Sequence, residues 1–244
     1  MKTAAELGLQ AHSGGEPRPD FATVSAMFRH AVATAADTVS LRHLGASVTY
    51  REEGRAVSAL ARRLASAAAP GEAVALVLPN SIEFRVAYFA ALEARAAPAL
   101  LNPLYPGPQL EPLLRDAAPR AVVCAPATRD VVAGLARKLG IAGVVCFGED
   151  ATIAGLAAEP EPPAGERREP VPADVAALLF SGGTTGTPKA VEHTHERLVV
   201  ATRCMEYSWP TRAAGEVWLP LRPSPTSTAS CRACWPRSPP SPRR

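Results

Sequence analysis

The chain has 244 residues, of which 47% are hydrophobic and 20% are charged. This composition is ordinary for a soluble protein with a hydrophobic core, and the length allows one large domain or two small ones. The five cysteines form no disulfide framework in a chain of this length. The net charge of +3 originates in residues 222–244, which hold five arginines and no acid, so the remainder is mildly acidic and predicts no nucleic-acid partner.

No stretch of the sequence approaches an uncharged membrane span, and residues 1–10 carry an acid and no apolar core of signal-peptide length. We therefore expect a cytoplasmic protein without a transmembrane segment. Residues 1–20 are rich in glycine, proline and polar side chains, and they are expected to form a flexible lead-in.

The next segment predicts two helices on either side of a hairpin. Ala56, Leu60 and Leu64 recur at helical spacing in the second of these helices. The predicted elements, in chain order, are a helix over 23–36, strands over 39–44 and 47–50 that turn around Gly45, and a helix that opens at 49–53.

Four apolar runs of strand length follow, each without polar alternation and with helical segments between them. Such strands are typical of a parallel sheet that helices cover on both faces. The predicted fold class is therefore α/β, a layered, mostly parallel sheet flanked by helices. Residues 151–174, rich in proline and glutamate, predict an exposed connector. The elements are strands over 73–78, 97–101, 121–124 and 142–147, with helices over 82–96 (capped by Ser81), 108–117 and 129–139.

An apolar run over 175–180 predicts another buried strand, and a glycine- and threonine-rich loop follows it directly. Glycines let backbone N–H groups turn toward one anion, threonine hydroxyls add donors, and a lysine adds a mobile positive charge. These residue types predict a polyphosphate-binding loop, with a flexible surface loop as the alternative. The candidate ligand-binding residues are Ser181, Gly182, Gly183, Thr184, Thr185, Gly186 and Lys189.

The loop differs from the common nucleotide-binding motifs. Pro188 separates the last glycine–threonine pair from Lys189, and no serine or threonine follows the lysine, as the Walker pattern would require. The spacing also departs from the Rossmann and protein-kinase glycine patterns. The loop therefore belongs to another kind of nucleotide site.

Residues 181–191 resemble the signature of the AMP-forming adenylating enzymes, which include acyl-CoA synthetases, 4-coumarate–CoA ligases and luciferases. That signature reads roughly Ser/Thr-Ser/Gly-Gly-Thr-Thr-Gly-x-Pro-Lys-Gly-Val. Gly182 stands where many members have serine, and Ala190 stands where most have glycine. Shorter matches at 78–81 and 102–105 occur in the same order in the first half of the family.

The resemblance covers residues 21–221 and implies the N-terminal portion of an adenylate-forming ligase domain, truncated in this chain. It implies ATP-dependent activation of a small-molecule carboxylic acid as an acyl-adenylate, followed by thioester formation with coenzyme A, an acid–thiol ligase reaction. The loop would hold the β- and γ-phosphates, and Lys189 would act catalytically by supplying charge to the leaving pyrophosphate. Mg²⁺ is implied by the nucleotide, and no metal ligand is identified.

In the family, the adenine-binding motifs and a small C-terminal domain follow the point where this chain ends. We therefore expect weak or absent turnover from the chain as written. The alternative is a non-catalytic nucleotide-binding or interaction module derived from such an enzyme.

The segment after the loop predicts a helix that starts within residues 192–197, with Thr194 as a possible cap, and continues to Cys204. His193 and His195 are two residues apart and therefore point to different sides of a helix. Both are assigned capping or solvated roles, and neither is predicted to be catalytic.

Residues 217–221 predict a further strand, after which the composition changes abruptly. Residues 222–244 hold six prolines and seven serines or threonines, and they predict a disordered basic tail. An RNA- or membrane-contacting arm is the alternative, and Cys231 and Cys234 supply only two metal ligands of the usual four. If the reading frame is shifted by one nucleotide before Arg222, codons can be chosen that encode an amino-acid sequence resembling the family's next motif. We therefore hypothesise that the tail is a frameshift product.

Overall fold

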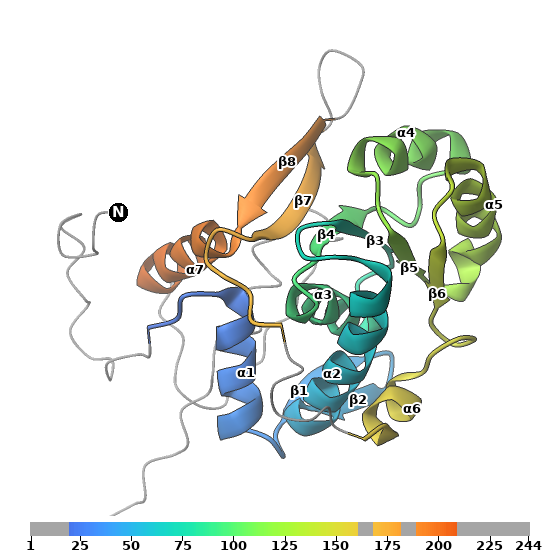
Figure 1. Ribbon diagram of the computed structural model, residues 1–244. Coiled ribbons are helices and arrows are strands. Elements are labelled where there is room, and N and C mark those ends of the chain that lie inside the picture. The colour runs from blue at the N-terminus through green and yellow to red at the C-terminus, as the bar shows by residue number, and fades with distance from the viewer. Residues whose placement is uncertain (1–19, 161–167, 182–188, 209–244) are drawn as a thin grey trace, which may run out of the picture.

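The computed structural model describes residues 20–160, 168–181 and 189–208, which form a sheet covered by helices (Figure 1). The predicted strand over 217–221, the lead-in over residues 1–19 and the tail over 222–244 lie outside these residues. The helices are α1 (Val24–Thr34), α2 (Tyr50–Ala67), α3 (Ile82–Glu93), α4 (Gly107–Ala117), α5 (Arg129–Leu139), α6 (Ile153–Ala158) and α7 (His195–Ser208), with a 3₁₀ turn at Pro126–Thr128. The strands are β1 (Val39–His43), β2 (Ala46–Thr49), β3 (Ala73–Val77), β4 (Ala97–Leu101), β5 (Ala121–Cys124), β6 (Gly143–Cys146), β7 (Val175–Ser181) and β8 (Lys189–Thr194).

Within the described part of the chain, the main sheet has six strands in the order β6-β5-β3-β4-β7-β8. The strands from β6 to β7 are parallel, and only β8 runs antiparallel to its neighbour. Every residue of β3, β4 and β5 is buried, as expected for strands with helices on both faces. The predicted α/β class and mostly parallel sheet are therefore confirmed.

Alternate residues of β3 belong to two separate cores. Val74 and Leu76 pack with α1, α2 and α3, whereas Ala75 and Val77 pack with α4 and α5. Because side chains alternate between the faces of a strand, continuous apolar strands supply both cores at once. Figure 1 shows α4 and α5 on the opposite side of the sheet from α2 and α3.

Local signals start several helices where the sequence predicts them. Thr49 and Glu52 form a capping box at the start of α2, and the Ser81 hydroxyl accepts the Phe84 N–H at 3.2 Å at the start of α3. The predicted helix over 82–96 is shorter than expected, since α3 ends at Glu93 and Arg95 adopts a left-handed φ of 58°.

The segment after the loop agrees with its predicted helix start but also holds an unforeseen strand. The helix starts at His195, within the predicted 192–197, and the Thr194 hydroxyl accepts the Arg197 N–H at 3.3 Å, as expected of a cap. Residues 189–194 form β8, which the sequence did not predict. Pairing with β7 supplies hydrogen bonds that local sequence does not reveal. The connector over 151–174 is not wholly exposed, because α6 lies within it and packs Leu156 against the first core.

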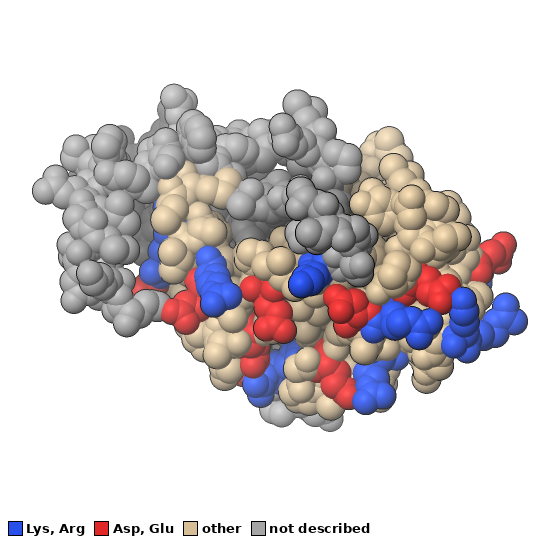
Figure 2. All heavy atoms as spheres, turned by 90° about the horizontal axis from the view of Figure 1, so that it is seen from above, with Lys and Arg blue, Asp and Glu red and all other residues tan. Residues whose placement is uncertain are grey.

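Charged side chains of both signs are interspersed on the face shown in Figure 2. Ion pairs among the described residues include Lys138 with Glu111 at 2.7 Å and Arg120 with Glu72 at 2.8 Å. Among the helices that the structure describes, none combines the length and the hydrophobicity needed to cross a membrane.

Candidate functional site

The candidate site lies at the end of the hairpin formed by β7 and β8. The two strands pair in antiparallel register from Val175 opposite Thr194 to Ser181 opposite Lys189. The predicted loop therefore leaves and re-enters the sheet at two facing positions, and Lys189 is exposed there. The predicted residues Gly182, Gly183, Thr184, Thr185 and Gly186 lie outside the described residues.

The hairpin end formed by Ser181 and Lys189 lies at the carboxyl edge of the parallel sheet. β7 pairs with β4 in parallel through Ala99 opposite Leu178 and Leu100 opposite Leu179. In open α/β sheets, ligands bind at the carboxyl ends of the strands. The turn that leaves β4 at the same edge is held by Asn102, whose Oδ1 accepts the Leu104 N–H at 2.9 Å, and the Leu104 side chain is 83% exposed.

A contact from α4 fixes the backbone beside Lys189. The N–H of Ala190 donates to Oδ2 of Asp116, at the C-terminal end of α4, over 3.2 Å. Sequence reasoning gave no sign of this contact, because 74 residues separate the two groups. The Asp116 contact lies on the exposed surface, so it orients the end of β8 without enclosing it.

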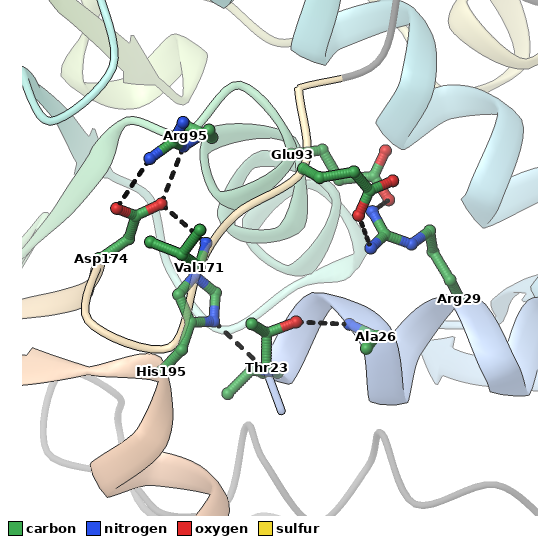
Figure 3. A network of polar contacts seen from close by, with 10 residues as sticks. Thr23, Ala26, Arg29, Glu93, Arg95, Val171, Asp174 and His195 are labelled. Atoms are coloured by element: carbon green, nitrogen blue, oxygen red, sulfur yellow. Dashed lines mark hydrogen bonds and ion pairs between the residues drawn. The ribbon is translucent and has the colours of Figure 1, made fainter. Parts of the chain in front are cut away.

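The opposite end of the hairpin is held by a partly buried polar network (Figure 3). The Arg95 guanidinium donates from Nε and Nη2 to the Asp174 carboxylate over 2.8 and 3.1 Å. Asp174 also accepts the Val171 N–H at 3.0 Å. These contacts, led by the hydrogen bond from Arg95, hold the pKa of Asp174 below its ordinary value.

His195 belongs to the same network and is only 1% exposed. Its Nδ1 accepts the N–H of Val24, the first residue of α1, over 3.2 Å, so the ring must carry no proton on this nitrogen. Burial lowers the pKa of His195 to about 4. The solvated role considered for this residue is therefore wrong. Its ring accepts an N–H at the start of a distant helix, α1, which the sequence did not predict.

Arg29 ties α1 to the same region. Its guanidinium lies 3.8 Å from Glu93 at the end of α3 and 2.5 Å from Glu169, which precedes β7 (Figure 3). The starts of α1 and α7, the end of α3 and the base of the hairpin thus meet in one polar cluster. None of these partners is adjacent in sequence, and the sequence offered no motif for them.

The described residues contain no group of three or more His, Cys, Asp or Glu side chains that could hold a metal ion. Asp116, the acid beside the hairpin end, already accepts a backbone N–H. The described part of the chain therefore does not assign ligands to the Mg²⁺ that accompanies ATP.

Comparison with known sequences places this geometry in a family. Residues 28–227 match the sequence profile of the AMP-binding enzyme family. The chain therefore belongs to that family, and the α/β fold and the glycine-rich segment after β7 agree with this membership.

Individual relatives include two kinds of enzyme. The chain is 37% identical over 206 residues to an isonitrile lipopeptide synthase of Mycobacterium tuberculosis, a match that covers 83% of this chain and 7% of the synthase. It is 37% identical over 150 residues to 4-coumarate–CoA ligase 5 of Oryza sativa, covering 59% of this chain and 28% of the ligase.

The structure also resembles solved members of the family. It superimposes on ATP-bound MatB from Rhodopseudomonas palustris with a TM-score of 0.64 and 27% identity, over 78% of this chain and 38% of MatB. This chain thus spans well under half the length of the relatives that it matches. The structural likeness identifies its fold with the N-terminal part of such ligases.

Proposed function

We propose that the chain binds Mg·ATP through the segment between β7 and β8 and takes part in activating a carboxylic acid as an acyl-adenylate. The observation that carries this proposal is the hairpin itself. Its ends, Ser181 and Lys189, lie at the carboxyl edge of a parallel sheet, where nucleotide ligands bind in related architectures.

In the proposed reaction, a carboxylate oxygen of the substrate attacks the α-phosphorus of ATP. The bond from that phosphorus to the bridging oxygen breaks, and pyrophosphate leaves with its electrons. The hydroxyl of Ser181 and the backbone N–H groups of the following glycines would hold the β- and γ-phosphates. Lys189 would offset the charge that grows on pyrophosphate, an effect that typically changes kcat by about 10²–10³-fold in enzymes.

The second half-reaction transfers the acyl group to a thiol, and AMP leaves. We propose coenzyme A as the acceptor, which agrees with the likeness to 4-coumarate–CoA ligase 5. The likeness to a lipopeptide synthase keeps a carrier-bound thiol as the competing acceptor. The proposed reaction uses a carboxylic acid as substrate and Mg²⁺ as the partner of ATP. The described residues do not identify which acid is used.

Two exposed lysines provide a matched test. Lys189→Ala should weaken Mg·ATP binding by at least 10-fold in isothermal titration calorimetry, because it removes the charge proposed to face the phosphates. Lys138→Ala, which removes another exposed lysine, one on α5 that pairs with Glu111, should bind as the wild type does. Equal binding by both variants would contradict the proposed site.

Chemistry is tested separately by ATP–pyrophosphate exchange with fatty and aromatic acids. Exchange that stops in Lys189→Ala supports adenylate formation. Lys189-dependent binding of ATP without exchange for any acid would instead support the non-catalytic nucleotide-binding module.

A further inference from the structure

We propose that Arg95, Asp174 and His195 are positioning residues that set the direction of the β7–β8 hairpin and thereby the place of Lys189. This inference rests on the proposed function, because it concerns how the phosphate-binding segment is held. None of the three side chains is proposed to touch ATP. They lie at the end of the hairpin that is farthest from Lys189.

Asp174 and His195 occupy equivalent places at the base of the hairpin. They are the first residues beyond the last register pair, Val175 opposite Thr194. The N–H of His195 donates to the carbonyl oxygen of Asp174 over 3.1 Å, which closes the ladder. Whatever fixes these two residues therefore fixes both strands together.

Each of the two residues is attached to a different helix. Asp174 is held by two hydrogen bonds from Arg95, just after α3. His195 is held through Nδ1 by the first N–H of α1. The hairpin base is thus fixed to two elements on the same side of the sheet, both of which belong to the first core.

Arg95 occupies a left-handed backbone position just after α3. Arg95 follows the C-cap of α3 with a φ of 58°, and the Ala96 N–H donates back to the Ala91 carbonyl over 2.9 Å. This is the position after a helix that glycine usually occupies, because a Cβ is strained there. Arginine at this position accepts a strained backbone conformation, and its side chain reaches Asp174.

Because the hairpin is long, a small rotation at its base produces a large displacement at its far end. Six residue steps of about 3.3 Å separate Val175 from Ser181, so a rotation of about 3° at the base moves the far end by about 1 Å. A misplacement of that size can cost an enzyme about 10²-fold in rate. Pairing with β4 through Leu178 and Leu179 fixes one line across the hairpin, and the exposed hydrogen bond from Ala190 to Asp116 holds its far end. The base contacts fix the opposite end.

Two substitutions separate positioning from stability. Arg95→Gly removes the ion pair but relieves the left-handed backbone, so the thermal midpoint should change by no more than a few degrees. Asp174→Asn keeps the shape of the side chain and removes its charge. Asp37→Asn is the matched control, since Asp37 accepts two hydrogen bonds from Arg51 at 3.1 and 3.3 Å on another surface.

The readout is calorimetric binding of Mg·ATP and of magnesium tripolyphosphate, which presents only the phosphate chain. We expect Arg95→Gly and Asp174→Asn to weaken both ligands by about 10-fold or more, and Asp37→Asn to leave them unchanged. His195→Asn, which restores an acceptor oxygen near the place of Nδ1, should bind more tightly than His195→Ala.

The outcomes distinguish this inference from the proposed function. If Lys189→Ala loses binding while Arg95→Gly and Asp174→Asn bind as the wild type does, positioning is overturned and the phosphate site stands. If the wild type binds neither ligand, the proposed function is wrong, and positioning is then tested by the ligand-free measurement below.

Amide hydrogen exchange in the free protein supplies a second measurement that needs no ligand. The backbone amides of β8 should exchange faster in Arg95→Gly than in Asp37→Asn. Equal protection in the two variants would also overturn the inference.

Discussion

Mild acid should destabilise this protein through His195. The imidazole is buried, and loss of hydration lowers its pKa from an ordinary 6.5 to about 4. The negative charge of Asp174 opposes this change, and the positive charge of Arg29 adds to it. A proton on Nδ1 would also remove the acceptor that the Val24 N–H uses in the folded chain.

The sign of the effect follows from proton binding in the two states. Below pH 6.5 the unfolded chain takes up a proton on this imidazole, whereas the folded chain stays neutral down to about pH 4. The unfolded state therefore binds more protons in this window, and the free energy of unfolding falls as the pH falls. At about 1.4 kcal/mol per pKa unit, the difference between the two states is worth about 3 kcal/mol.

The measurement is urea denaturation followed by circular dichroism at intervals from pH 7.5 to 4.5. The wild type should lose most of those 3 kcal/mol or so across this range. His195→Asn cannot titrate there, so its free energy of unfolding should change much less with pH. The carboxylates whose pKa is lowered, such as Asp174, act at lower pH and are common to both proteins. Parallel pH profiles for the two proteins would refute the burial argument.

Three further predictions concern the framework around the site. Glu53→Gln should cost about 3–5 kcal/mol in urea denaturation, because it leaves the buried Arg85 without the carboxylate that accepts its two hydrogen bonds at 2.6 and 2.8 Å. Arg168→Met should cost about 2 kcal/mol, since the guanidinium donates to three carbonyls at the C-terminal ends of α2 and α3. Brief iodoacetamide treatment at pH 8 should alkylate the exposed Cys204 and spare Cys124, whose pKa burial raises to about 12.

Each of these predictions has a clear contrary result. Replacing both members of the buried pair, as in Glu53→Leu with Arg85→Met, should cost less than Glu53→Gln alone, and a larger loss would contradict the ion-pair explanation. An unchanged midpoint in Arg168→Met would mean that water satisfies the helix ends equally well. Peptide mapping that finds Cys124 alkylated as fast as Cys204 would show that the second core opens readily.

The sequence by itself determined the class of fold and the family. Apolar runs such as 73–78 specify buried parallel strands, because only strands covered on both faces need no polar alternation. Helix caps such as Thr49 and Ser81 bind N–H groups within four residues in sequence, so they can be predicted from the sequence alone. The signature over 181–191 was recognisable for the same reason, since its chemistry lies in one continuous segment.

The tertiary structure alone decided what surrounds that segment. β8 exists because β7 lies beside it, and a six-residue stretch that ends in Thr194 carries too little local signal to distinguish a strand from a helix start. The Arg95–Asp174 pair joins residues 79 apart, and His195 meets Val24 across 171 residues. Such contacts depend on how helices pack across a sheet, which neither propensity nor spacing records.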